Sequence, residues 1–281
     1  MTITGFLAGS AAAYLSLSLA MTYGVHRFPR RPVREPPDWG RLTDARIPAA
    51  DGGSLEVWRV EPEGVQRGIV LLAHGWSRNR DRMVGRARLF GKLGYTTVIH
   101  SARDHGESTP YRFMNAFRFA EDIESVMDWA GEPLHLYGHS AGAAGAIIAA
   151  HNRPDMVRLL FLEGCYARTR KALVSLYGHH IPVLGKVFAP TVVAWMNLFY
   201  RGRMDWVDPV RLAPDLDIPV LLIQGELDKA FPLDYARELR DAFPPGRAEL
   251  FVGRGSDHSS SSLTPEYPEA IRTFLERHDP V

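Results

Sequence analysis

A serine at position 140 lies in a Gly-His-Ser-Ala-Gly run at 138–142. An apolar stretch at 134–137 precedes the run, and small apolar residues at 143–148 follow it, an order typical of a strand, a tight turn and a helix. The flanking glycines let strand and helix pass closely, so the turn can hold the serine hydroxyl above a sheet. We therefore predict that Ser140 is a nucleophile rather than part of an ordinary turn.

A serine hydroxyl is a poor nucleophile at neutral pH and needs a base that a third group orients. The chain has 11 histidines, so position must choose among them. His258 lies in a small polar loop at 253–259, after the last predicted strand. Such a loop can bring the imidazole back over Ser140, and we predict that His258 is the base.

The orienting acid is expected on a loop between the serine and this histidine. Asp228 follows the predicted strand at 219–224, and we predict that it orients His258. Glu163, at another strand end, is the reserve acid. Asp257 adjoins His258 in the chain, which argues against its reaching the Nδ1 atom of that ring.

Acyl transfer from such a serine also needs two backbone N–H donors for the oxyanion. The N–H of Ala141, at the start of the predicted helix, is one. The other is expected in the His-Gly-Trp-Ser run at 74–77, after an apolar strand, and we assign it to Trp76. His74 is expected to hold this loop by a ring hydrogen bond. The histidines and acids show no HExxH-like spacing, so we predict no metal site.

Alternating strands and helices must position these residues. Apolar runs that suit buried strands are separated by amphipathic segments, which indicates a mainly parallel sheet with helices on both faces. The predicted strands are 42–48, 54–60, 68–73, 95–100, 134–137, 157–162, 219–224 and 248–252. The predicted helices besides the one after Ser140 are 81–93, 116–130, 233–242 and 265–276.

One long segment, 166–217, interrupts this alternation and is rich in aliphatic and aromatic residues. We interpret it as a helical lid insertion over the carboxyl ends of the strands, where open α/β sheets bind ligands. Many of its apolar residues would form the insertion's own core. Trp195, Met196 and Phe199 are our candidates for lining a substrate pocket.

The first residues carry a different signal. No charged residue occurs from Ile3 to Val25, and an arginine-rich stretch follows this segment. Its length could span a bilayer with the body on the cytoplasmic side; a helix packed on a soluble cytoplasmic protein is the alternative. A proline-rich linker begins at Pro29, so we divide the chain into an N-terminal part (1–40), a core (41–165 and 218–281) and the insertion (166–217).

Net charge and cysteine content exclude some classes of function. Thirty-three basic and 32 acidic residues give a net charge of +1, which provides no basic surplus for a nucleic-acid partner. The single cysteine, Cys165, excludes a disulfide framework within the chain and a metal site built on thiolates.

Taken together, the runs at 74–76, 103–108 and 138–142, with Asp228 and His258, resemble the α/β-hydrolase family in type and order, over about residues 42–278. The resemblance implies an eight-stranded sheet with a lid after the sixth strand, and catalysis without a cofactor. It is nearest to the serine esterase, lysophospholipase and monoacylglycerol-lipase branches. Many members carry Gly-His or Gly-Gly-His where this chain has Asp257-His258.

The expected activity is therefore hydrolysis of carboxylic esters of lipophilic acyl groups through an acyl-enzyme. Thioesterase, peptidase and other acyl-transfer activities stay open, because the fold hosts several chemistries. A non-catalytic binding member of the fold is the other alternative. Such members usually lack a triad residue, and none is missing here.

Overall fold

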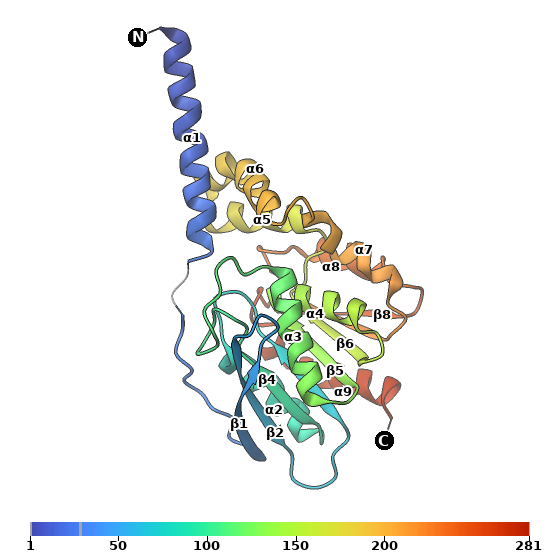
Figure 1. Cartoon of the computed structure of the whole chain (residues 1–281). Coiled ribbons are helices and arrows are strands. Elements are labelled where there is room, and N and C mark those ends of the chain that lie inside the picture. The colour runs from blue at the N-terminus through green and yellow to red at the C-terminus, as the bar shows by residue number, and fades with distance from the viewer. Residues whose placement is uncertain (1, 28–29, 281) are drawn as a thin grey trace.

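The computed structural model describes residues 2–27 and 30–280 and is built on one eight-stranded sheet, in the order β1-β2-β4-β3-β5-β6-β7-β8 (Figure 1). Strands β1 and β2 are antiparallel, β2 pairs antiparallel with β4, and the pairings from β4 through β8 are parallel. The strands are β1 (Arg41–Pro48), β2 (Ser54–Glu61), β3 (Ile69–Ala73), β4 (Thr96–His100), β5 (Leu134–His139), β6 (Val157–Glu163), β7 (Val220–Gly225) and β8 (Ala248–Gly253). This confirms the predicted mainly parallel sheet of eight strands.

Helices cover both faces of the sheet, as predicted, because successive side chains of a buried strand point to opposite sides. Leu71 and Leu136 face α3 (Ala116–Ala130) and α4 (Ala141–Asn152), and α8 (Leu233–Arg240) covers the same side. Leu72 and Phe161 face α2 (Val84–Lys92) and α9 (Tyr267–His278). The inner strands therefore lie between two apolar layers.

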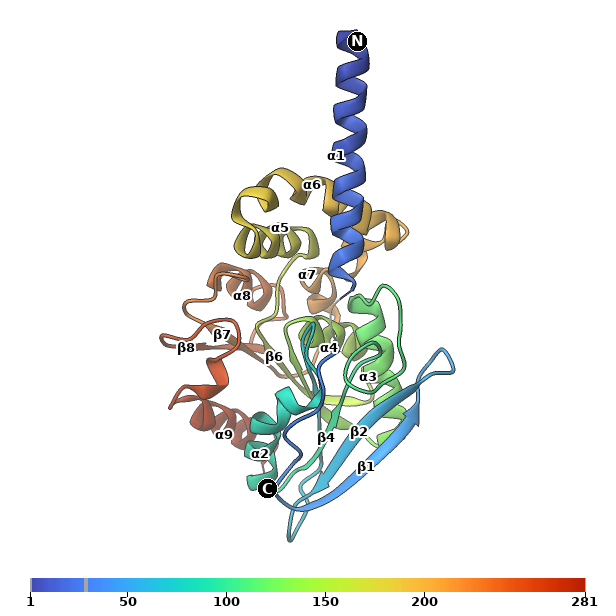
Figure 2. The ribbon, with the colours of Figure 1, turned by 90° about the vertical axis from the view of Figure 1, so that its left-hand side faces the viewer.

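The connection from β6 to β7 contains α5 (Thr169–His180), α6 (Pro182–Phe199) and the short α7 (Pro209–Leu212). The apolar side chains of α5 and α6 form a small core of their own, which includes Tyr177, Val192 and Met196. We refer to residues 166–217 as the insertion. It lies over one end of the sheet, beside helix α1 (Figures 1 and 2).

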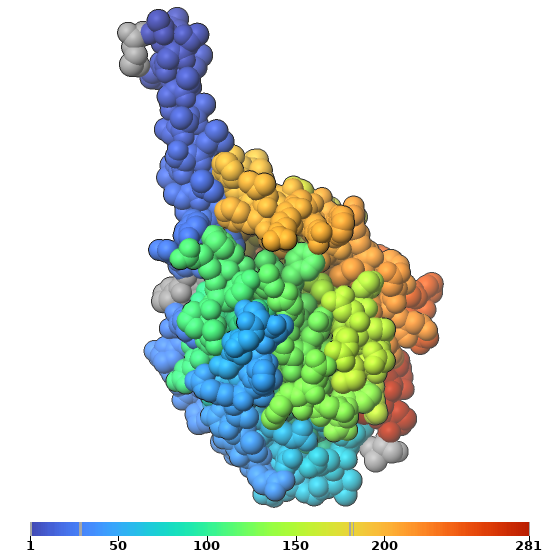
Figure 3. All heavy atoms as spheres, viewed as in Figure 1, coloured from blue at the N-terminus to red at the C-terminus, as the bar shows by residue number. Residues whose placement is uncertain are grey.

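Helix α1 (Ile3–Val25) projects from the body (Figure 3), and only its second half is packed. The Tyr14 ring stacks on Phe188 of α6 at 4.9 Å, and Ser18 and Thr22 are buried. The first half is exposed, with Ile3 81% accessible. In the described part of the chain, α1 is the one helix long and apolar enough to cross a membrane.

The linker after α1 is held against the body. Asn79 donates through Nδ2 to the carbonyl oxygens of Arg31 (2.9 Å) and Pro32 (3.1 Å), and the chain continues past α2 into β1. Met1, Val281 and Pro29, with which the predicted linker begins, lie outside the described residues.

Candidate active site

Ser140 occupies the turn between β5 and α4 with φ 55° and ψ −118°, a conformation that a non-glycine residue rarely adopts. The turn is tight because α4 begins at once and passes close to β3. A Cβ added at Gly142 would lie 2.5 Å from the carbonyl oxygens of Ala73 and His74, so only glycine fits there. The local sequence thus fixes the backbone that presents the Ser140 hydroxyl.

The structure brings Ser140, His258 and Asp228 into one hydrogen-bond chain. The Nε2 atom of His258 lies 2.9 Å from Ser140 Oγ, and its Nδ1 atom lies 2.7 Å from Asp228 Oδ2. Because the Asp228 carboxylate can only accept, the neutral ring carries its proton on Nδ1 and donates it to Oδ2, which leaves Nε2 free to accept from the serine. This is the arrangement in which an imidazole can withdraw a hydroxyl proton.

Asp228 is held rigidly behind His258. Its Oδ1 accepts the N–H groups of Ala230 and Phe231, both at 2.9 Å, and its Oδ2 also accepts from Gln224 Nε2 at 2.8 Å. The side chain of Asp228 is fully buried. These donors satisfy the buried carboxylate and leave its Oδ2 aimed at the ring.

The loop that carries His258 is fixed by its neighbours. His139 donates from Nε2 to the His258 carbonyl oxygen at 3.0 Å, and burial lowers the pKa of His139 to about 3, so this ring stays neutral. Gly164, with φ +58°, packs against the His258 ring; a Cβ there would lie 3.0 Å from His258 Cε1. Neither contact was predicted from the sequence.

The two other acids near the site have different partners. Glu163 forms a buried bidentate ion pair with Arg86 (2.5 and 2.7 Å) and accepts from Tyr137 Oη at 2.8 Å. Burial opposes ionisation of Glu163, yet Arg86 lowers its pKa to about 2. Asp257 accepts the N–H of Ser259 within its own loop. The hydrogen bonds of both acids therefore favour Asp228 as the partner of His258.

Both candidate oxyanion donors lie beside Ser140. Ala141 is the first residue of α4, and Trp76 packs with it against Phe119. Gly75 brings this loop close to the serine, since a Cβ at Gly75 would lie 3.0 Å from Ser140 Cβ. The backbone of this loop is thus within reach of a carbonyl attacked by Ser140.

His74 holds the same loop, as predicted: its Nδ1 donates to Gly75 O at 2.7 Å, and its Nε2 accepts the Ala102 N–H at 3.0 Å. His105 accepts the Ser77 N–H at 3.1 Å, which ties the loop after β4 to the loop after β3. In the described residues, no group of three or more His, Cys, Asp or Glu side chains is arranged to hold a metal ion.

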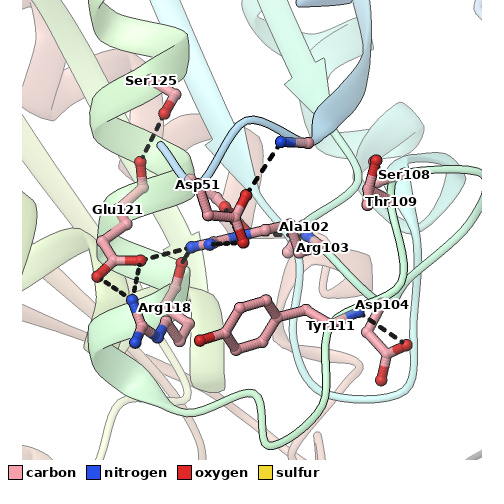
Figure 4. Close-up of polar contacts among 12 residues, drawn as sticks. Asp51, Ala102, Arg103, Asp104, Ser108, Thr109, Tyr111, Arg118, Glu121 and Ser125 are labelled. Atoms are coloured by element: carbon pink, nitrogen blue, oxygen red, sulfur yellow. Dashed lines mark hydrogen bonds and ion pairs between the residues drawn. The ribbon is translucent and has the colours of Figure 1, made fainter. Parts of the chain in front are cut away.

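Arg103 anchors the loop after β4 (Figure 4). Its guanidinium is fully buried and pairs with Asp51 (2.8 Å), Glu121 (2.6 Å) and Asp122 (2.5 Å). The Arg103 guanidinium thus joins the loop after β4 to the β1–β2 turn and to helix α3. If the loop moved away, the buried Arg103 charge would lose its partners, which is costly. The network therefore holds the loop in place.

The three candidate lid residues occupy different places. Phe199, at the end of α6, packs on Phe113 (5.1 Å), and both contact His26, whose ring lies 5.8 Å from that of Trp76. Phe199 therefore belongs to an aromatic cluster that reaches the oxyanion loop.

Met196 is buried in the insertion's own core. The indole N–H of Trp195 donates to Ser18 Oγ at 2.9 Å, so this side chain joins the insertion to α1. The sequence analysis did not single out His26 or Phe113, although His26 directly follows the apolar segment Ile3 to Val25.

Comparisons with known proteins identify the family of the chain. A family model described as serine aminopeptidase S33 matches residues 64–201, and one described as TAP-like protein matches residues 201–278. The monoglyceride lipase of Rattus norvegicus is 24% identical over 265 residues, covering 80% of this chain and 86% of the lipase.

Among solved structures, an esterase of Pyrococcus furiosus has a TM-score of 0.70 at 17% identity and covers 90% of this chain and 100% of its own. A membrane phospholipase A has a TM-score of 0.63 at 17% identity and covers 99% of this chain and 95% of its own. At these identities the structural likeness shows the fold alone.

Proposed function

Because the chain belongs to the α/β-hydrolase family, we propose that it hydrolyses carboxylic esters of lipophilic acyl groups, with Ser140 as the nucleophile. The observation that carries the proposal is the continuous hydrogen-bond chain from Ser140 Oγ through His258 to Asp228, at 2.9 and 2.7 Å. The groups proposed for acyl transfer gather around one half-buried turn.

In the proposed reaction, Ser140 Oγ attacks the ester carbonyl carbon while His258 Nε2 takes the hydroxyl proton. The N–H groups of Trp76 and Ala141 stabilise the oxyanion of the tetrahedral intermediate. His258 then gives its proton to the leaving alkoxide oxygen, and the acyl group remains on Ser140. Water then attacks the acyl carbon while His258 Nε2 takes a proton from it. The bond between the acyl carbon and Ser140 Oγ breaks, His258 returns the proton to Oγ, and the carboxylic acid leaves.

The apolar surroundings favour a lipophilic acyl group. The aromatic cluster of Phe199, Phe113 and His26 continues outward from Trp76, between α1 and the insertion. The insertion also exposes large apolar residues, among them Val183, 78% accessible, and Trp206, 63% accessible. Such a surface is unusual for a protein that meets only water and suits contact with lipid or an acyl chain.

We expect kcat/KM to rise with acyl length. Each methylene moved from water into an apolar pocket contributes about 0.8 kcal/mol, so four methylenes would raise kcat/KM about a hundredfold. Phe199→Ala should lower kcat/KM about tenfold for long p-nitrophenyl esters and leave the acetate unchanged. Val65→Ala, at an exposed apolar position before β3 and outside the insertion, is the matched control. A flat wild-type profile, or a sharp preference for acetate, would contradict the pocket.

Peptide hydrolysis is the second candidate, because the model that matches residues 64–201 describes a serine aminopeptidase. Aminoacyl p-nitroanilides tested beside the acyl esters distinguish the two activities. Turnover of the anilides alone would favour a peptidase, whereas turnover of long acyl esters alone would favour the proposed esterase.

We also propose that α1 anchors the protein in a membrane with the body on the cytoplasmic side. The projecting half of α1 is apolar and exposed, and Arg27, Arg30 and Arg31 follow the helix. The membrane phospholipase A aligns over 99% of this chain, a share that includes most of α1. The insertion lies on the side of the body from which α1 projects (Figure 3), and its exposed apolar residues include Val183 and Trp206.

The anchor predicts a change in fractionation. Full-length protein should sediment with membranes, and Ala11→Arg with Leu15→Arg should move it to the soluble fraction, since each charge near a helix centre costs about 3 kcal/mol of insertion. Val65→Arg with Leu42→Arg adds the same charge at exposed apolar positions of the body and should leave it membrane-bound. Wild-type protein recovered wholly in the soluble fraction without detergent would favour a packed helix.

A further inference from the structure

A cavity of about 490 Å³ lies between the linker, the start of α2 and the loop after His258. It is separate from the catalytic groups, since neither Ser140 nor Asp228 lines it. Its charged lining residues are five arginines and two carboxylates: Arg31, Arg34, Arg78, Arg82, Arg86, Glu35 and Asp81.

Most of this positive charge has no acidic partner. Arg86 is neutralised by Glu163, but Arg31, Arg34, Arg78 and Arg82 make no ion pair within residues 2–27 and 30–280. The Nε atom of Arg82 is buried without a hydrogen-bond partner in that same part of the chain. A buried guanidinium N–H of this kind is costly unless a ligand or water accepts from it.

The arginines also crowd one another. Burial lowers the pKa of Arg82, and the neighbouring guanidinium groups of Arg86 and Arg78 lower it further. Burial lowers the pKa of Arg78 as well, with Arg31 as the next cause. An anion among these groups would relieve the repulsion between them.

The walls are built from two segments that are fixed to each other. Beside the contacts from Asn79 to the linker carbonyls, the backbone N–H of Arg34 donates to Asp81 Oδ2 at 3.1 Å. The linker is therefore held with Arg31 and Arg34 at the cavity, opposite Arg78 and Arg82 of the body.

We propose that this cavity binds the phosphate group of a small soluble molecule. Four unpaired arginines facing Glu35 and Asp81 leave a surplus of about two positive charges, which matches the charge of a phosphomonoester near neutral pH. The planar guanidinium group also suits the oxygens of phosphate. Figure 2 shows α2 and the linker on the body, away from the projecting end of α1, which favours a soluble ligand over a lipid headgroup.

A bound phosphate would be linked through Arg82 to the loop that carries His258. Arg82 donates from Nη2 to the carbonyl oxygen of Ser259 at 2.8 Å, and Ser259 is the residue after His258. Phosphate held by Arg82 and Arg31 would thus join the linker to the loop that carries the base. Arg82 is in this sense a positioning residue.

The test is calorimetric titration of full-length protein in detergent micelles with inorganic phosphate and with glycerol 3-phosphate, at constant ionic strength set by chloride. We expect both to bind, and Arg78→Gln and Arg31→Gln each to weaken Kd at least about tenfold, the loss of one charge-assisted contact. Arg158→Gln removes an exposed arginine at the amino end of β6 and should leave Kd unchanged.

Three results would overturn the proposal: no binding by wild type, equal Kd in wild type and Arg78→Gln, or a response to anionic lipid vesicles without any response to the two soluble phosphates. Because Arg31 is exposed, Arg31→Gln should keep the thermal stability of the wild type, which separates loss of binding from loss of folding. The titration uses no ester substrate, so its outcome is independent of the proposed hydrolysis.

Discussion

Ser140→Ala should lower kcat for p-nitrophenyl acyl esters by about six orders of magnitude, because the acyl-enzyme can no longer form. The residual rate would come from the oxyanion donors and from substrate binding, which alanine leaves in place. The turn should survive the change, since its shape is fixed by the close contacts at Gly142 and alanine is smaller than serine.

A fluorophosphonate probe measures the same assignment without a substrate. It should label the wild type and fail to label Ser140→Ala. Ser259→Ala is the matched control, because it removes a hydroxyl one residue from His258 and leaves the hydrogen bonds from Ser140 to Asp228 in place. Equal labelling of wild type and Ser140→Ala would show that another residue is the nucleophile.

The sheet and the turn at Ser140 could be predicted because their signals are local. Each strand is a short apolar run closed by turn residues, and the glycines around Ser140 stand next to the contacts that require them. Asp228 and His258 could be chosen because both follow strands, and the carboxyl ends of parallel strands meet at one edge of the sheet.

Contacts between distant segments could not be predicted in this way. Arg86 lies on a helix whose sequence gives no sign of an acidic partner, yet it determines that Glu163 is paired at 2.5 Å. The same holds for Trp195 and Ser18, which meet because the second half of α1 packs along α6. Such pairs depend on how helices are arranged around the sheet, and an amphipathic pattern specifies a buried face without specifying its partner.

Asp228→Asn should lower kcat about 10⁴-fold per folded molecule, because it changes the tautomer of His258, and it should also cost some stability, because the Gln224 amide loses an acceptor. The side-chain amide of the variant can place its oxygen at the former Oδ1 or the former Oδ2 position. At the Oδ1 position the backbone N–H groups of Ala230 and Phe231 both require an acceptor, whereas the Oδ2 position faces one donor from Gln224 besides the ring. The amide carbonyl therefore takes the Oδ1 position, and the NH₂ group points at His258 Nδ1.

A donor at that position forces the imidazole to place its proton on Nε2, where it can no longer accept from Ser140. Asp257→Asn makes the same chemical change next to His258 and should stay within a few-fold of wild type, because an amide oxygen can still accept the Ser259 N–H.

Glu163→Gln tests the reserve acid. It leaves the buried Arg86 without its partner and should destabilise the fold by about 3–5 kcal/mol, so kcat must be compared per folded molecule, with the folded fraction measured by thermal or denaturant unfolding. On that basis Glu163→Gln should retain most of its kcat. Near-full activity in Asp228→Asn, together with a large loss per folded molecule in Glu163→Gln, would assign the orienting role to Glu163, despite its 2.5 Å pairing with Arg86.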